Sequence, residues 1–175
     1  QNTIIQIIGK SVTTMFGILA LVLMTRYLGL EGFGQYTTIS SFLMFFGILV
    51  DFGLTLVTAQ MLAEPGVDVN KTLSNLFTVR FFSALIFFGS APIIVLFFPY
   101  PVIVKLGVAI ATFSFFLISL NQVLVGLFQN NLAMGKVVLA ETFSRLTLFF
   151  LIIVTIWLNG GILGIVLTTV IATIV

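Results

Sequence analysis

Long apolar runs separated by short polar or glycine-rich segments repeat along the whole chain. About twenty residues of α-helix span the roughly 30 Å hydrocarbon core of a bilayer. The alternation of polar and apolar positions that marks the strands of a membrane barrel is absent. We therefore predict an all-α integral membrane protein, a bundle of five complete and one partial transmembrane helices. The predicted spans are approximately residues 3–25, 36–61, 74–98, 102–128 and 138–158, with a partial span at 162–175.

Glycine, proline and polar residues mark the connections between these runs. The stretch Thr25–Tyr36 contains Gly29, Gly32 and Gly34, and glycine tolerates the positive φ that tight turns need. This stretch therefore predicts a hairpin between the first two spans. Polar loops are predicted at 64–71 and 129–136, and tight turns at 98–101 and 159–161. Pro92 is predicted to kink the third span.

Composition narrows the class of protein. The 175 residues are 60% hydrophobic and 7% charged, with a mean hydropathy of +1.30, whereas a soluble domain carries roughly 25% charged residues. With no cysteine and no histidine, disulfides, thiolate catalysis, histidine bases and histidine-ligated metals are excluded. The net charge of +2 is too small to indicate nucleic-acid binding. Since the chain begins with Gln1 and ends at Val175 within an apolar run, we expect it to be part of a longer protein.

No catalytic, cofactor or metal site is predicted. Asp51-Phe-Gly53 matches the letters of the kinase metal-binding triplet, but it lies within a predicted span. No phosphate-binding or catalytic loop accompanies it. We therefore predict that the protein is not an enzyme.

Lysine and arginine set the orientation, because positive charge accumulates on the cytoplasmic side. A cytoplasmic N-terminus places five of the seven basic residues on the inner side, and Arg26 and Lys105 on the outer side. The five are Lys10, Lys71, Arg80, Lys136 and Arg145. The predicted location is the cytoplasmic membrane, with the N-terminus inside.

Charged residues within the spans are the candidate functional groups. Asp51, Arg80, Glu141 and Arg145 lie within or at the inner half of the spans, and a charge at mid-bilayer costs about 2.5 to 3.5 kcal/mol. We expect them to face one another or water. Glu141 and Arg145 are four residues apart with the acid first, the order that favours an ion pair on one helix face.

Structural alternatives stay open for each of these residues. Arg80 could extend its guanidinium to the headgroups, and Lys10 has the same option. The Glu141–Arg145 pair could be a structural clamp. Asp51 belongs to a small and polar stripe that either lines a polar interior or packs closely against another helix. That stripe is Ser40, Met44, Gly47, Asp51, Thr55 and Thr58.

Several short motifs in order resemble the N-terminal signature of the polysaccharide biosynthesis flippases, in the multidrug/oligosaccharidyl-lipid/polysaccharide exporter superfamily. They are Arg26-Tyr-Leu-Gly29, Phe33-Gly34-Gln-Tyr36 and Asp51-Phe-Gly-Leu54, with Leu127-Phe-Gln129, Lys136 and Ser144-Arg145 later in the chain. The resemblance extends over essentially the whole chain.

The resemblance implies a two-lobed transporter, of which this chain would be the N-terminal lobe and lack its C-terminal partner lobe. Such proteins move lipid-linked saccharides on polyprenyl diphosphates across the membrane by alternating access. Arginine binds diphosphate through several hydrogen bonds at once, so the candidate headgroup contacts are Arg80, Arg145, Arg26 and Lys10. Asp51 and Glu141 are then candidates for charge balance or ion coupling.

Other functions make different predictions from the same chain. A cation-coupled multidrug exporter of the same superfamily should carry more acidic residues in its cavity. A membrane-embedded glycosyltransferase or polymerase should have a large aqueous loop with clustered carboxylates. A non-transporting membrane scaffold should lack deep polar stripes. The flippase prediction fits the sequence best.

Overall fold

The computed structural model describes residues 2–63, 66–130 and 134–174, and within these ranges it is helical with no strand. The elements in order are α1 (Asn2–Asp51), α2 (Leu54–Ala63), α3 (Val69–Ile94), the 3₁₀ turn η1 (Val95–Phe97), α4 (Val102–Asn130), α5 (Met134–Trp157) and α6 (Gly161–Ile174). The all-α prediction is confirmed.

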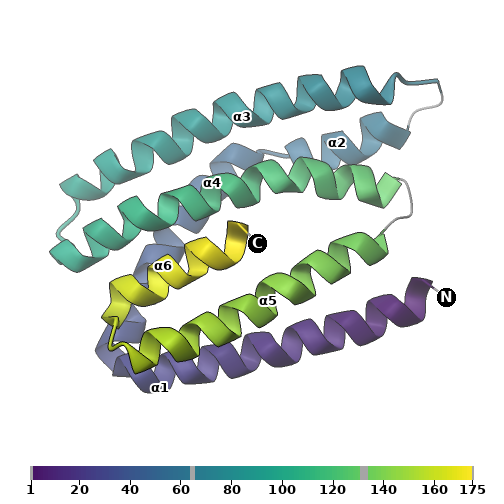
Figure 1. The fold of residues 1–175 in the computed structure, drawn as a ribbon. Coiled ribbons are helices and arrows are strands. Elements are labelled where there is room, and N and C mark those ends of the chain that lie inside the picture. The colour runs from purple at the N-terminus through teal and green to yellow at the C-terminus, as the bar shows by residue number, and fades with distance from the viewer. Residues whose placement is uncertain (1, 64–65, 131–133, 175) are drawn as a thin grey trace.

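The first helix is a hairpin rather than one rod. Its continuity breaks at Gly29, where φ is 67° and ψ is −174°, and Figure 1 shows the two parts of α1 running in opposite directions. The predicted hairpin is thus present, but the turn is narrower than predicted, because Gly32 and Gly34 are already helical. Gly32 is buried, and a Cβ there would lie 3.1 Å from the Leu28 Cβ on the other side of the turn, so the absence of a side chain at Gly32 suits the tight turn.

The second predicted span, 36–61, is not continuous, which corrects the sequence prediction. Helix α1 ends at Asp51 and α2 begins at Leu54. Between them Phe52 has a φ of 32° and Gly53 a φ of 85°, values outside the helical region. The second crossing is therefore built from two helical pieces.

The remaining helices match the predicted spans, with shifted ends. Helix α3 begins five residues earlier than predicted, since the Asp68 side chain accepts a hydrogen bond from the Lys71 amide at 3.1 Å and caps the helix. It continues through Pro92 and ends two residues later. Most of the predicted 129–136 loop is helical, and its residues 131–133 lie outside the described residues, as do 64–65 of the first loop and Val175 of the partial span.

The helix ends gather at two opposite ends of the bundle. Figure 1 shows the N-terminus of α1, the last turns of α2 and α4 and the first turns of α3 and α5 at one end. The turn of α1 and the α3–α4 and α5–α6 connections lie at the other. This is the alternation that successive membrane crossings require.

Length and hydropathy identify the membrane-spanning helices. In the described part of the chain, four helical stretches are long and apolar enough to cross a bilayer: Gly9–Asp51, Val69–Phe97, Val102–Val125 and Val137–Trp157. The first, with 43 residues, is about 65 Å long, twice the hydrocarbon thickness. Because it folds back at Gly29, it supplies two crossings. The chain is a multi-pass membrane protein.

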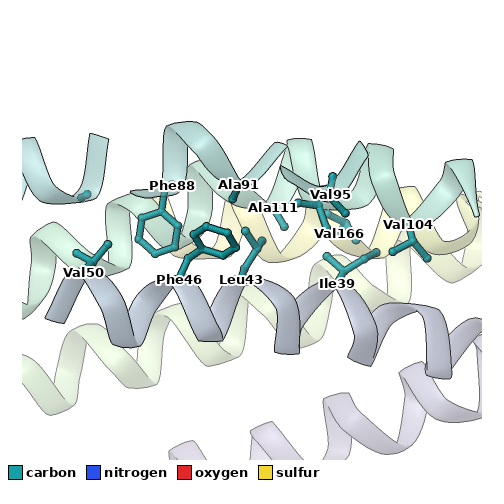
Figure 2. Close-up of a cluster of buried hydrophobic side chains, with 12 residues drawn as sticks. Ile39, Leu43, Phe46, Val50, Phe88, Ala91, Val95, Val104, Ala111 and Val166 are labelled. Carbon is teal, nitrogen blue, oxygen red and sulfur yellow. The ribbon is translucent and has the colours of Figure 1, made fainter. Parts of the chain in front are cut away.

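The main hydrophobic cluster joins the second half of α1 to α3, α4 and α6. Figure 2 shows Ile39, Leu43, Phe46 and Val50 projecting from one face of α1 toward these helices. Helices α1 and α4 approach closely at Gly107, where a Cβ would clash with Ile39 Cδ1. The second half of α1 is therefore anchored along its length, up to the break after Asp51.

A second cluster joins the first half of α1 to α5 and α6. Its buried members are Ala20, Met24, Ile152 and Ile165. At the end of the bundle that holds the α1 turn, the Tyr27 hydroxyl accepts a hydrogen bond from the Gly161 amide at 3.0 Å. These contacts attach α5 and α6 to the hairpin.

Candidate functional site

The break in the second crossing places two polar side chains next to each other. Asp51 ends α1 and Thr55 lies in the first turn of α2. The Thr55 hydroxyl donates to the Asp51 carboxylate across the break. The Phe52 amide donates to Ile48 O at 3.0 Å, so α1 closes its last turn before the chain changes direction.

Arg80 on α3 connects both sides of this break. Its Nη1 donates to Asp51 Oδ1 at 2.7 Å and its Nη2 to Thr55 Oγ1 at 3.2 Å. Helix α4 supplies two further acceptors, the Ser119 carbonyl at 3.1 Å from Nε and Gln122 Oε1, which bonds Nη2. Four helices thus meet at one guanidinium, and we refer to Asp51, Thr55, Arg80, Ser119 and Gln122 as the Arg80 network.

Burial explains why the arginine needs these partners. Arg80 is 2% exposed and is the largest of the fully buried side chains, and it lies 11 residues after the start of α3, about 16 Å along the helix. An unpaired cation there would cost several kcal/mol in desolvation. Asp51 neutralises it and stays 34% exposed. Arg80 therefore bonds to protein groups and does not extend to the headgroups.

The polar stripe of the second span does not lie on a single face. The break divides it after Asp51, and its members have different surroundings: Met44 is 65% exposed, whereas Thr58 on α2 is 3% exposed and donates to Leu54 O. Gln122 and the Ser119 carbonyl were not predicted as partners. An amide side chain within an apolar span was the only signal that could have indicated Gln122.

Glu141 and Arg145 on α5 are both exposed. They form no ion pair with each other: within the described residues, the ion pair with a basic side-chain nitrogen within 4.0 Å of a carboxylate oxygen is Arg80–Asp51. The structural clamp, one of the alternatives left open for these two residues, is therefore not formed in the described structure. Neighbouring hydroxyls fix the helix: Ser144 donates to Ala172 O at 2.5 Å and Thr142 lies 2.9 Å from the Thr13 hydroxyl.

The other predicted basic residues, Lys10 and Arg26, lie on the first half of α1 and are exposed. Sixteen residues separate them, about 24 Å of helix. Lys10 follows Gly9, where a Cβ would clash with Val138 of α5, so it lies at the end of the bundle where α5 begins. Arg26 lies near the turn at Gly29. The four predicted cations therefore do not form one cluster.

A hollow of about 400 Å³ lies beside the start of the second half of α1, and sequence reasoning did not predict it. It is lined by Thr37, Thr38, Ser41, Phe42 and Tyr100. Phe98 stacks on Tyr100 with ring centroids 5.5 Å apart. Hydroxyl groups and aromatic faces thus meet at this end of the bundle.

Metal ligation is not indicated in the described part of the chain, where no three Asp, Glu, His or Cys side chains come together. The site instead consists of one closed polar network and an exposed acid and base on α5. Neither a curated protein nor a solved structure matches the chain. The family model described as polysaccharide biosynthesis protein matches residues 1–175. Because this match covers the entire sequence, the chain belongs to the polysaccharide biosynthesis protein family.

Proposed function

We propose that the protein is a flippase, which moves a lipid-linked saccharide across the cytoplasmic membrane by alternating access. Family membership supports a role in polysaccharide biosynthesis, and the multi-pass helical bundle supports transport. We further propose that the chain forms the N-terminal lobe of a two-lobed transporter, with its N-terminus in the cytoplasm.

The observation that carries this proposal is the exposure of Glu141 and Arg145 on α5. Arg145 lies 11 residues from the first residue of α5 and 12 from the last, so it is at the middle of the span. A charge facing lipid at that depth costs about 2.5 to 3.5 kcal/mol. One turn apart, the two side chains share a helix face. That face fits a polar transport path better than it fits lipid.

The guanidinium N–H groups of Arg80 and Arg145 differ in whether they are available to bind a substrate. Arg80 uses its guanidinium on Asp51, Thr55 and α4, so we assign it to positioning these helices. Arg145 has no acid within ion-pair distance in the described structure, and its planar guanidinium can bind a diphosphate through two parallel hydrogen bonds. We therefore propose Arg145 as the main headgroup contact, with Lys10 at the inner end and Arg26 at the outer end of the path.

The two acidic residues, Asp51 and Glu141, likewise differ in whether they already have a partner. Asp51 balances Arg80. Glu141 has no basic partner within 4.0 Å in the described residues, which leaves it as the candidate for balancing a headgroup contact or carrying a coupling ion. The hydroxyls and rings around Phe42 and Tyr100 fit a saccharide leaving at the outer end, because hydroxyls can both donate and accept hydrogen bonds.

The test is translocation by the full-length protein in proteoliposomes that contain an undecaprenyl-diphosphate-linked saccharide. Arg145→Ala should lower the initial rate about tenfold or more, since a hydrogen bond to a charged group is worth about 1.5–3 kcal/mol. Arg145→Lys should retain part of the rate, because it keeps the charge and loses the bidentate geometry.

The control is Lys105→Leu, which removes a basic residue from the same bundle. Lys105 donates to the Leu96 carbonyl at 3.0 Å and lies outside the proposed path, so this variant should translocate at the wild-type rate. Wild-type rates for Arg145→Ala at equal protein levels would contradict the proposal. So would transport of a cationic dye with no transport of the saccharide.

A further inference from the structure

The second crossing has an unusual backbone where its two pieces meet. Phe52 adopts a φ of 32° and Gly53 a φ of 85°; for a residue with a side chain, such a positive φ costs about 1–3 kcal/mol. Packing does not impose this conformation locally, because Phe52 is 88% exposed and a Cβ on Gly53 would meet nothing within 4 Å. Contacts outside the break must therefore hold the two pieces at this angle.

Helix α2 itself is weakly held by hydrophobic packing. Of its described side chains only Thr58 and Leu62 are buried, both 3% exposed, while Leu56 is 67% exposed. By contrast, the second half of α1 buries four core side chains against three other helices. The two pieces of this crossing therefore differ in how firmly they are fixed.

The Arg80 network supplies the contacts that hold α2 in place. Arg80 bonds Asp51 before the break and Thr55 after it, while its Nε bonds the Ser119 carbonyl of α4. One buried side chain thus fixes the angle between α1 and α2 and attaches both to α3 and α4. Its removal would release the α2 side of the break and leave the α1 side anchored.

One atom of the network is unsatisfied. Ser119 Oγ is the buried side-chain oxygen or nitrogen that has no hydrogen-bond partner in the described structure, and it belongs to the residue whose carbonyl accepts from Arg80. A buried unpaired hydroxyl costs about 1–3 kcal/mol. The network is therefore not fully satisfied at its α4 side.

We propose that Phe52–Gly53 is a hinge in the second crossing and that Arg80 is the positioning residue that holds α2 in one orientation about it. When the Arg80 network opens, α2 pivots about the hinge while the second half of α1 stays packed. This inference concerns a conformational change and does not depend on the identity of the substrate.

The test measures the α1–α2 angle in the full-length protein in lipid nanodiscs. Residues 1–175 contain no cysteine, so in a full-length background without reactive cysteines elsewhere, Phe45→Cys on α1 and Met61→Cys on α2, at positions 59% and 39% exposed, carry one pair of spin labels. Phe82→Cys on α3 and Phe113→Cys on α4, at positions 56% and 52% exposed, carry a reference pair. Pulsed electron resonance gives the distance distribution of each pair.

Changes in the Arg80 network should act on the α1–α2 pair alone. Arg80→Gln should broaden its distance distribution about twofold or populate a second distance, as expected for a released hinge. Arg80→Lys should give an intermediate result, because it keeps the pair with Asp51 but not the fork that reaches α4. Lys105→Leu, which removes a basic residue outside the network, should match the wild type.

The two substitutions at the hinge should change the distance distribution of the α1–α2 pair in different ways. Gly53→Ala should shift the α1–α2 pair to longer distances, because alanine disfavours the positive φ and favours a continuous helix. Phe52→Gly should broaden the distribution, because glycine adopts more conformations at this position. A Cβ at Gly53 meets nothing within 4 Å, and Phe52→Gly removes a side chain that is 88% exposed, so both variants should fold.

The reference pair distinguishes hinge motion from loss of folding. An unchanged reference pair with a wild-type α1–α2 distribution in Arg80→Gln would overturn the proposal. If Arg80→Gln also disturbs the reference pair, Gly53→Ala decides: a shift of the α1–α2 pair alone supports the hinge, and no shift overturns it. If Arg80→Gln and Gly53→Ala lose saccharide transport but keep wild-type distances for both pairs, the hinge proposal is overturned and the proposed function is not contradicted.

Discussion

Arg80 and Asp51 lie 29 residues apart in the sequence, but Arg80 Nη1 is 2.7 Å from Asp51 Oδ1. The arginine side chain is 2% exposed and the aspartate side chain 34%. This asymmetry predicts unequal effects of removing either partner. Asp51→Ala leaves a buried cation without a counter-charge, which costs about 3–5 kcal/mol. Arg80→Met keeps most of the side-chain volume and leaves unpaired a carboxylate that is only partly buried, so it should cost less. Thermal unfolding in detergent measures both.

The double variant checks this explanation. Adding Arg80→Met to Asp51→Ala removes the buried charge, and replacing both partners by apolar groups can be nearly neutral. The double variant should therefore unfold at a higher temperature than Asp51→Ala alone. If the double variant instead lost as much unfolding temperature as the two single variants together, the ion pair would not be what stabilises this region.

Close packing between α1 and α4 predicts a clash that a second substitution relieves. A Cβ at Gly107 would clash with Ile39 Cδ1, and Ile39 is 1% exposed and has little room to move. Gly107→Ala should destabilise the protein by about 1–3 kcal/mol through overpacking. Ile39→Val removes the clashing methyl group, so Gly107→Ala should cost less in that background. Gly89→Ala is the control, because nothing lies within 4 Å of a Cβ there.

Hydropathy predicted the crossings because in a bilayer each backbone group must be bonded within its own helix, which makes long apolar runs helical. It could not predict the break after Asp51. Glycine is frequent in membrane helices and does not by itself end one, so Gly53 gave no signal that differed from Gly47, which is helical. The partner contacts that hold the break lie on α3 and α4, beyond the reach of local sequence.

The charged residues show a similar limit. The free-energy cost of a charge in the bilayer identified Asp51 and Arg80 as side chains that need partners. Only the packing of α1 against α3 makes them partners of each other. The spacing of Glu141 and Arg145 favoured an ion pair, but the structure shows none, because spacing gives proximity and not a preferred rotamer. Exposed pairs of this kind contribute only about 0–1 kcal/mol, so other interactions decide where the side chains lie.

The alternation of helix ends predicts which segments face opposite sides of the membrane. Leu30, after the α1 turn, is 95% exposed, and Asp68, before α3, is exposed at the other end of the bundle. In the cysteine-free chain, Leu30→Cys should react with a membrane-impermeant maleimide added outside intact cells. Asp68→Cys should react only after the cells are opened. Labelling of both from one side would contradict the alternation, and the reverse pattern would invert the proposed orientation.

Alanine should change the stability of the protein in opposite directions at Gly29 and at Gly34. Gly29 has a φ of 67° and a ψ of −174°, a region that only glycine occupies readily. Gly29→Ala should therefore destabilise the hairpin by about 1–3 kcal/mol, and Gly29→Asn should do no better, because asparagine tolerates the left-handed helical region and not this one. Gly34 is helical and a Cβ there meets nothing within 4 Å, so Gly34→Ala should be neutral or stabilising by up to about 1 kcal/mol. Thermal unfolding of the three variants tests this, and equal losses at both positions would mean that the turn extends over Gly34 as well.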